Sequence, residues 1–314
     1  MRPGQVHKIV SRLLSPLGMV FSGCEQLLLL YSDRRDLDPD GPSLVFIVGA
    51  PRSGTSIAFQ YITQRLNVSF PTHFCALFPQ APALSLVLSD ALFRRPHRCL
   101  RSIHGFSIGD GLRGPNEWET LFRDRVCKRL RQGRNLAPEF DRLLWGIDLW
   151  IDRPVIVKAL NVSLSIGSFA QIVPRSKFLW VDRDPLSVAR SIYRAKRREG
   201  KMASQIWYVS NDALESMTFG SEAEQIASQV TLIRDSIASS FEMLPDNRRE
   251  RLSYHDLCTH PERQIEKVAK WLGSHITLRS GEQLSRLDEA ISKPLDDQKV
   301  DEDLHRLLGT TSLT

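Results

Sequence analysis

The segment from Gly49 to Ser56 has the spacing of a phosphate-binding loop. Four residues separate Gly49 from Gly54, and the hydroxyl residues Thr55 and Ser56 follow directly. A glycine-containing turn between a strand and a helix aims backbone N–H groups at one point, which then binds phosphate. An ATPase or GTPase has a lysine where this chain has Thr55, and the basic residue here, Arg52, lies inside the loop. The loop therefore predicts an anion site unlike that of a nucleoside triphosphatase.

Arg183 and Ser191 form a second pair of groups that suit an anion. Arg183 directly follows an apolar run, and Ser191 comes eight residues later on a predicted helix. Eight residues make just over two helical turns, so the hydroxyl can face the guanidinium if the helix doubles back past the strand end. The alternative is a structural ion pair between Arg183 and Asp182 or Asp184.

The elements that must position these residues alternate along the chain. Apolar runs predict strands at 44–48, 154–157, 178–181 and 251–254, and helical periodicity predicts helices at 166–172, 186–198, 222–244 and 261–272. This alternation is typical of an α/β fold with three layers, in which helices cover both faces of a parallel sheet. Ligands bind such sheets at the carboxyl ends of the strands. We therefore expect the loop, Lys158 and Arg183 at one edge, because each directly follows a strand.

The composition fits one large globular domain. The chain has 314 residues, of which 42% are hydrophobic and 25% charged, and no Gly/Ser/Pro-rich linker divides it. We expect a helical segment over 1–40 and a single domain over 41–314, with an irregular insertion at about 75–150 that shapes the substrate site. The net charge of +6 suits anionic ligands without indicating nucleic acid. The five scattered cysteines form no C-x-x-C pair, which favours a reducing compartment and argues against a zinc site.

The N-terminal segment has apolar residues at helical spacing from Val6 to Leu17. Its basic residues are Arg2, Lys8 and Arg12, and no acidic residue comes before Glu25. Two interpretations stay open: an amphipathic helix on a membrane surface, or a helix packed on the core or on another subunit of a homo-oligomer. The charge at Arg12 interrupts the apolar stretch that a signal peptide needs, so we expect a cytoplasmic enzyme, either free or peripherally bound to a membrane.

Both anion motifs resemble those of sulfotransferases that use 3′-phosphoadenosine 5′-phosphosulfate (PAPS). The 5′-phosphosulfate loop of that family is similar to Pro51, Arg52, Ser53, Gly54, Thr55 and Ser56. Its 3′-phosphate motif, an Arg-x-Pro followed by a serine, is similar to Arg183, Pro185 and Ser191. The resemblance runs from about residue 44 to 275, and the pattern is nearest to carbohydrate, tyrosylprotein and bacterial members. It implies a P-loop NTPase-like sulfotransferase fold and transfer of a sulfuryl group from PAPS to an acceptor hydroxyl, with release of PAP.

The chemistry of sulfuryl transfer agrees with the altered loop. A kinase needs a lysine and Mg²⁺ because the phosphoryl group it transfers carries two negative charges. A sulfuryl group carries one, so the loop amides, Arg52 and the hydroxyls of Thr55 and Ser56 could hold it without a metal. The 3′-phosphate of PAPS needs a separate anion site, which Arg183 and Ser191 would supply. We therefore expect PAPS as co-substrate and no metal.

The resemblance also implies catalytic roles. Lys158 follows a strand, as does the lysine that stabilises the leaving phosphate oxygen in many carbohydrate and protein sulfotransferases; a solvated strand terminator is the alternative. Two residues are candidates for the base that takes the acceptor proton. His73 lies where tyrosylprotein-type enzymes carry a glutamate, although its apolar surroundings also suit a core histidine. Glu117 lies in a Gly/Pro loop, where it could instead line the acceptor site or cap a helix.

Two further residues resemble nucleotide-binding positions of the family. Tyr254 begins a Tyr-His-Asp-Leu sequence similar to a Tyr-Glu-Asp-Leu element whose tyrosine lies near the cofactor. Lys293 precedes a proline, as does a late lysine that helps hold the nucleotide in tyrosylprotein-type enzymes. Those enzymes also have an arginine where this chain has Ala195, which leaves Arg194 or Lys196 as substitutes.

Other functions stay open from the sequence. One alternative is a kinase-like phosphotransferase with a degenerate loop, and another is a catalytically silent protein that binds PAP or a related nucleotide. The middle region is rich in arginine and poor in long apolar runs. This composition suits an anionic or sugar-like acceptor, although the same residues would also form an ordinary helical surface. We expect a small-molecule or carbohydrate acceptor, such as the hydroxyl of a sugar or glycolipid. No nucleic-acid partner is expected.

Overall fold

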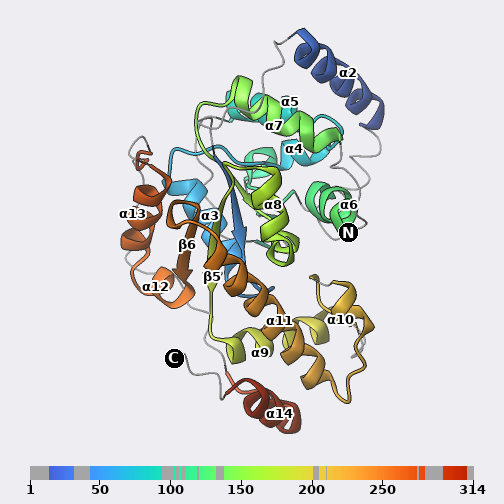
Figure 1. Ribbon diagram of the computed structural model, residues 1–314, viewed down its shortest axis with the longest axis vertical. Helices are drawn as coiled ribbons and strands as arrows, with labels where there is room; N and C mark the ends of the chain where they lie inside the picture. The colour runs from blue at the N-terminus through green and yellow to red at the C-terminus, as the bar shows by residue number, and fades with distance from the viewer. Residues whose placement is uncertain are drawn as a thin grey trace.

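A four-stranded parallel sheet with the order β4-β1-β5-β6 organises the molecule (Figure 1). The computed structural model describes residues 14–31, 43–93, 102–103, 106–107, 110–118, 120–131, 138–200, 205–209, 211–273, 276–279 and 293–309. The strands are β1 (Leu44–Val48), β4 (Val155–Lys158), β5 (Lys177–Asp182) and β6 (Arg249–Ser253). Phe46 of β1 lies opposite Val157 of β4 and Phe178 of β5. The predicted parallel α/β sheet is confirmed, and each strand lies within two residues of its expected bounds.

Helices cover both faces of this sheet. In chain order, the described helices are α2 (Ser15–Tyr31), α3 (Thr55–Arg65), α4 (His73–Leu77), α5 (Pro82–Leu92), α6 (Lys128–Arg131), α7 (Pro138–Trp150), α8 (Ile166–Ile172), α9 (Pro185–Glu199), α10 (Asp212–Ser216), α11 (Glu222–Met243), α12 (Tyr254–Thr259), α13 (Pro261–Leu272) and α14 (Gln298–Leu308). A π-helix spans Thr120–Cys127, and short 3₁₀-helices span Gly111–Arg113, Leu160–Leu164 and Asp246–Arg248. A small antiparallel pair joins β2 (Ser102–Ile103) to β3 (Phe106–Ser107).

The two faces of the sheet have separate cores because successive strand residues point to opposite sides. On one face Phe46 contacts the rings of Phe122 at 5.6 Å, Phe169 at 5.2 Å and Phe178 at 5.6 Å. On the other face Ile47 belongs to a core formed with α3, α12 and α13. Figure 1 shows α8 and α11 on the first side of the strands and α12 and α13 on the second. Burial on both faces explains why β1 is an uninterrupted apolar run.

The middle region, expected to be an irregular insertion with helical stretches, contains the helices α5, α6 and α7. Helices α5 and α7 cross closely at Gly146, where a Cβ atom would lie 2.3 Å from the Cβ of Ala83. The loop after the first 3₁₀-helix is tied back to the start of α4, because the His73 amide donates to Gly114 O at 2.9 Å. The Asn116 amide likewise donates to Pro71 O at 2.9 Å. These bonds fix the position of the neighbouring Glu117.

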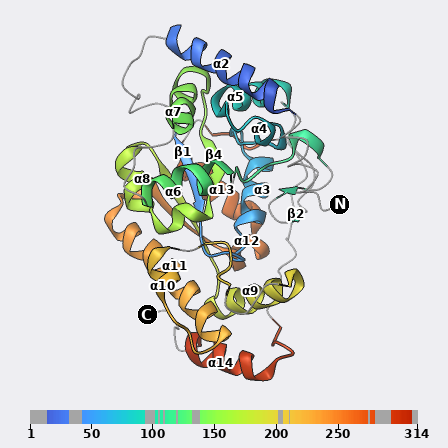
Figure 2. The same cartoon turned by 90° about the vertical axis from the view of Figure 1, so that its right-hand side faces the viewer.

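Helices α2 and α14 lie at opposite ends of the molecule (Figure 2). The C-terminal residues have little sequence pattern, yet α14 forms and Arg190 of α9 pairs with Asp301 at 2.7 Å. The expected N-terminal helix falls mostly outside the described residues, and α2 begins only at Ser15. The division into a segment over 1–40 and a domain over 41–314 stays a prediction. None of the described helices is both long and apolar enough to cross a membrane.

Candidate active site

The loop between β1 and α3 has an unusual backbone that requires glycine. Gly49 has a φ of 155°, Gly54 a φ of 96°, and even Arg52 has a φ of 71°. A Cβ on Gly54 would lie 2.1 Å from the Cδ2 atom of Tyr254, so no other residue fits without displacing that ring. The Ser53 hydroxyl is buried and has no hydrogen-bond partner among the described residues. A strained loop with an unpaired buried hydroxyl at a helix N-terminus is a site prepared for an anion.

The two anion motifs meet at Arg52. Its Nε atom donates to the Ser191 hydroxyl at 3.2 Å, and Nη1 of Arg183 donates to its backbone oxygen at 3.1 Å. Burial lowers the pKa of Arg52, and the nearby positive charge of Arg183 lowers it further. Two guanidinium groups held together in this way are stabilised by an anion placed beside them.

The contacts of Arg183 direct its guanidinium group toward the loop between β1 and α3. Its guanidinium lies over the ring of Tyr254, 4.5 Å from the centroid, as in a cation–π contact. Asp182 and Asp184, the alternative ion-pair partners of Arg183, have other contacts. Asp182 pairs with Arg234 at 3.1 Å, and Asp184 caps α9 by accepting from the Ser187 amide at 2.7 Å. Arg183 is therefore positioned by aromatic and backbone contacts beside Arg52.

Glu117 and Lys158 form an ion pair at the same edge of the sheet. Lys158 ends β4 and its side chain is 5% exposed, while that of Glu117 is 15% exposed. Oε1 of Glu117 also accepts a hydrogen bond from the Ser56 hydroxyl at 2.9 Å. One carboxylate oxygen thus joins the end of β4 to the start of α3. This places an acid–base group, a cation and the phosphate loop side by side.

A cavity of about 280 Å³ contains most of the predicted site residues. It is lined by Pro51, Arg52, Gly54, Thr55, Ser56, Ile57, Glu117, Lys158, Leu160, Arg183, Ser191, Trp207, Tyr208 and Tyr254. Trp207 and Tyr208 were not predicted from the sequence. Gln229 of α11 holds this segment by donating to the backbone oxygens of Trp207 at 2.5 Å and Val209 at 2.7 Å. Trp207 and Tyr208 are adjacent aromatic residues soon after the helix that carries Ser191. This pair was the sequence signal that could have identified the segment as part of the site.

Three predicted site residues do not line this cavity: His73, Ser53 and Lys293. His73 is buried and its Nδ1 atom lies 3.1 Å from Nδ2 of Asn116. Lys293 is exposed, and its backbone oxygen accepts from Arg194. Lys196 is also no substitute for the family arginine, because it is fully buried and pairs with Glu222 at 3.1 Å. Arg194 instead anchors the segment that leads to α14.

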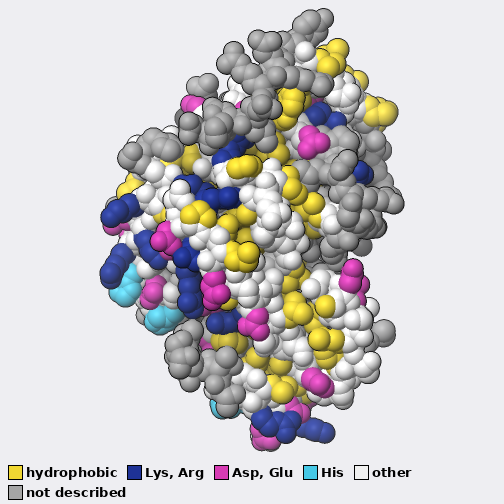
Figure 3. All heavy atoms as spheres, in the orientation of Figure 1, with side chains coloured by type: hydrophobic (Ala, Val, Ile, Leu, Met, Phe, Trp, Pro, Cys, Tyr) yellow, Lys and Arg dark blue, Asp and Glu magenta, His cyan; other side chains and the backbone are white. Residues whose placement is uncertain are grey.

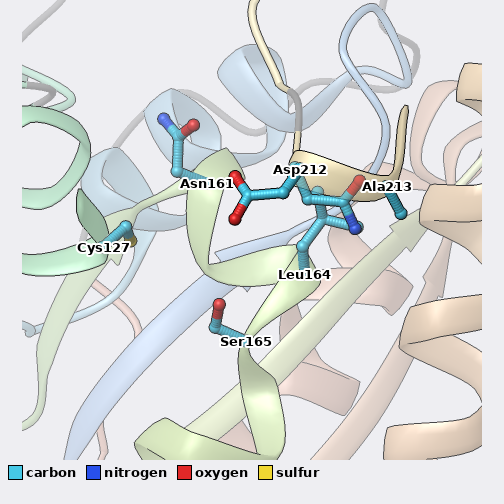
Figure 4. Close-up of a pocket in the computed structure, with 7 residues that line it drawn as sticks. Cys127, Asn161, Leu164, Ser165, Asp212 and Ala213 are labelled. Atoms are coloured by element: carbon cyan, nitrogen blue, oxygen red, sulfur yellow. The ribbon is translucent and has the colours of Figure 1, made fainter. Parts of the chain in front are cut away.

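A second pocket of about 270 Å³ lies at the 3₁₀-helix that follows Lys158 (Figure 4). It is lined by Cys127, Asn161, Leu164, Ser165, Asn211, Asp212 and Ala213. Consecutive residues of this 3₁₀-helix line the two pockets, Leu160 the first and Asn161 the second. Figure 4 shows Asn161 and Asp212 together at one side, with Ser165 below them in the view. Within the described residues, no group of three or more His, Cys, Asp or Glu side chains could hold a metal ion.

Comparison with known proteins identifies the family. A model described as the sulfotransferase family matches residues 42–277. No curated protein matches the chain. Among solved structures, sulfotransferase STF9 from Mycobacterium avium is 14% identical, with a TM-score of 0.47, over 87% of this chain and 69% of that one. Sulfotransferase STF1 from Mycobacterium tuberculosis H37Rv is 12% identical, with a TM-score of 0.48, over 88% and 73%. Because the family model covers well over half of its length, the chain belongs to the sulfotransferase family.

Proposed function

We propose that the protein transfers a sulfuryl group from PAPS to a hydroxyl group of its acceptor and releases PAP. The observation that carries this proposal is the bond between the two anion motifs, in which Arg52 Nε donates to Ser191 Oγ at 3.2 Å. PAPS has two separated phosphate positions, on the 5′ and 3′ oxygens of one ribose. A single cavity with two anion sites, one at a helix N-terminus and one at Arg183 and Ser191, matches that pattern.

The residues present fit the donor. The loop amides and the hydroxyls of Thr55 and Ser56, which line the cavity at the start of α3, would hold the 5′-phosphosulfate. Arg183 and Ser191 would hold the 3′-phosphate, with Arg52 between the two groups. Trp207 and Tyr208 offer aromatic faces at the cavity wall against which a purine base can stack.

The catalytic step needs a proton acceptor and a group that stabilises the leaving oxygen. The acceptor oxygen forms a bond to sulfur as the bond between sulfur and the 5′-phosphate oxygen breaks. Lys158 stabilises the negative charge that develops on that phosphate oxygen. Glu117 takes the proton of the acceptor hydroxyl. Both contacts of its carboxylate, from Ser56 and Lys158, use Oε1, which leaves Oε2 to face the acceptor.

The geometry supports Glu117 over His73 as the base. Glu117 lines the cavity beside Lys158, whereas His73 is buried outside it. His73 contacts the loop that carries Glu117 twice, through its backbone amide to Gly114 O at 2.9 Å and through Nδ1 to the amide of Asn116 at 3.1 Å. We assign His73 the role of positioning this loop.

The neighbouring pocket supports a polyhydroxylated acceptor such as a carbohydrate. Among the described residues, its lining has the amides of Asn161 and Asn211, the hydroxyl of Ser165 and the carboxylate of Asp212, and no basic side chain. Neutral amides and carboxylates are the groups that hydrogen-bond sugar hydroxyls. The shared 3₁₀-helix places this pocket next to the residues that follow Lys158.

The test combines binding and transfer. Calorimetry with PAP should show binding in the absence of metal, and ³⁵S-labelled PAPS should label a carbohydrate from a panel of acceptors. No PAP binding at millimolar concentration would falsify the proposal. Melting shifts with ATP but not with PAP would indicate a kinase-like protein instead. PAP binding with no transfer to any sugar, steroid, phenol or peptide acceptor would indicate a silent nucleotide-binding protein.

A further inference from the structure

Helix α2 has a broad apolar face that is exposed to solvent. Met19 is 64% exposed and Leu30 60%, and Leu17, Val20 and Leu27 are also exposed. At 100° per residue these five side chains occupy about 160° of the helix circumference. Glu25 is the only charged residue in the helix, and it points to the opposite side, where it is fully buried. The outward face of α2 therefore contains no charge.

The inward face of α2 is attached firmly to the domain. Oε1 of Glu25 accepts from Nε of Arg142 at 2.8 Å, and Oε2 accepts from the Leu84 amide at 2.8 Å. The ring of Phe21 packs against that of Phe78, with 4.5 Å between centroids. An ion pair, a backbone hydrogen bond and an aromatic contact thus hold one side of the helix against α7, α5 and the end of α4. The helix can present its other side to a partner without leaving the domain.

The location of α2 makes this face accessible to a flat surface. Figures 1 and 2 both show α2 at one end of the molecule, with α14 at the other. Figure 3 shows hydrophobic side chains at the outer edge where α2 lies, whereas charged side chains gather over α12 and α13. A planar partner could therefore reach the apolar face at this end.

We propose that the outward face of α2 rests on the surface of a membrane that contains anionic lipids. The charge of the adjoining chain favours this occupant, since residues 1–24 contain Arg2, Lys8 and Arg12 and no acidic residue. An apolar helix face next to basic residues inserts at the boundary between headgroups and acyl chains, and the basic residues attract anionic headgroups. Because the ion pair of Glu25 holds the inward side of α2 against the domain, only the outward side can contact the membrane. The helix would then lie in the interface and not cross the bilayer.

A second copy of the chain is a less suitable occupant. A helix of 17 residues is about 26 Å long and about 10 Å wide, so its outward face has a footprint of about 260 Å². A stable protein interface buries about 800 Å² on each partner. Membrane contact has no comparable minimum, because electrostatic attraction of basic residues adds to the insertion of apolar side chains. This inference does not depend on sulfuryl transfer from PAPS.

The experiment measures co-sedimentation of the full chain with vesicles of phosphatidylcholine alone or with about 30% phosphatidylserine. The variant V20E/L27E places two charges on the outward face, and the matched control M243E changes a side chain that is 87% exposed on α11. We expect the wild-type chain and M243E to bind the anionic vesicles, and V20E/L27E to bind at least about tenfold less tightly. The variant K8Q/R12Q keeps the apolar face, and it should lose the preference for phosphatidylserine.

Melting temperature and PAP binding, measured on each variant, show whether it is folded. Wild-type chain that stays in the supernatant, or V20E/L27E that sediments like wild type while folded, would overturn the proposal. Sedimentation velocity without vesicles tests whether a second copy of the chain covers this face instead. A wild-type dimer that V20E/L27E converts to monomer would overturn it in favour of a second copy.

Discussion

After the proposed function, we call the side of the cavity with the phosphate loop its donor end and the side with Glu117 its acceptor end. The two ends are built in different ways. At the donor end each group follows directly from a strand: the loop from β1, Lys158 from β4, Arg183 from β5 and Tyr254 from β6. At the acceptor end Glu117 comes from a loop between a 3₁₀-helix and a π-helix, and backbone bonds tie this loop to Pro71 and His73. The sheet hydrogen bonds fix the first set, whereas a few side-chain and backbone bonds fix the second.

This difference indicates how the two ends should respond to change. A substitution at the donor end alters a position that the sheet holds rigidly, so strain cannot relax and PAP binding should weaken. A substitution at the acceptor end should separate the catalytic step from nucleotide binding, because the loop of Glu117 contacts the phosphate loop only through Ser56. Substitutions at each end therefore test this separation.

The largest effect on PAP affinity is expected from Gly54→Ala. The new Cβ atom would lie 2.1 Å from the ring of Tyr254, at a φ of 96°. Strain at such a position costs about 1–3 kcal/mol before the clash is counted. We expect PAP affinity to fall by about 100-fold or more, measured by calorimetry. Adding Tyr254→Ala to this variant should restore part of the affinity by removing the clash.

Gly200→Ala is the matched control for Gly54→Ala. Gly200 also has a positive φ, 63°, but an added Cβ meets nothing within 4 Å, and the residue does not line the cavity. Its substitution should leave PAP affinity unchanged while lowering stability by about 1 kcal/mol. If Gly54→Ala binds PAP as tightly as Gly200→Ala does, the donor end is not rigid.

The largest effect on the transfer rate is expected from Glu117→Gln. Glutamine keeps the shape of the side chain but takes up a proton poorly, so the transfer rate should fall by about 10²- to 10⁴-fold. PAP affinity should change by only about a few-fold, because Glu117 contacts the phosphate loop through Ser56 alone. Single-turnover transfer from labelled PAPS measures the first quantity and calorimetry the second.

His73→Gln distinguishes the two candidate bases. If His73 positions the loop of Glu117, its substitution should slow transfer by about tenfold or less, because Asn116 still has its bond to Pro71. The pH at which the rate is half-maximal should then stay that of the wild-type enzyme. A larger loss in His73→Gln than in Glu117→Gln would make His73 the base, as its position in the sequence suggests.

The two ends also differ in how far the sequence predicts them, and the donor end is the more predictable. Buried parallel strands leave continuous apolar runs, so the positions of Gly49, Lys158 and Arg183 at one edge could be predicted. The loop glycines were recognisable because their φ values exclude other residues. These signals are local, within one strand and the turn after it.

The acceptor end has no comparable local signal. The pair between Glu117 and Lys158 joins residues from separate elements, and the loop of Glu117 is held by His73 at the start of another helix. Helix α14 was missed for the same reason, since its contact with Arg190 depends on Asp301, more than one hundred residues away. Such contacts form only when the tertiary structure is complete, and a pattern along the chain does not contain them.

Arg183→Lys tests the 3′-phosphate site specifically. Lysine keeps the charge but loses the planar group that stacks on Tyr254 and that can contact phosphate through two N–H bonds. PAP affinity should fall by about tenfold. Binding of adenosine 5′-phosphate, which lacks the 3′-phosphate, should change little. An equal loss for both nucleotides would place the role of Arg183 at the 5′ position or in the structure of the loop.

The smallest effect is expected from Asn161→Ala in the second pocket. Removing one amide that hydrogen-bonds a sugar hydroxyl should raise the acceptor KM by about three- to tenfold, which corresponds to about 0.7–1.4 kcal/mol. PAP affinity should stay the same, because Asn161 lines only the second pocket. Asn247→Ala, at an exposed asparagine in another 3₁₀-helix, is the matched control. An unchanged acceptor KM in Asn161→Ala would exclude this pocket as the acceptor site, since the acceptor would then have to reach Glu117 by another route.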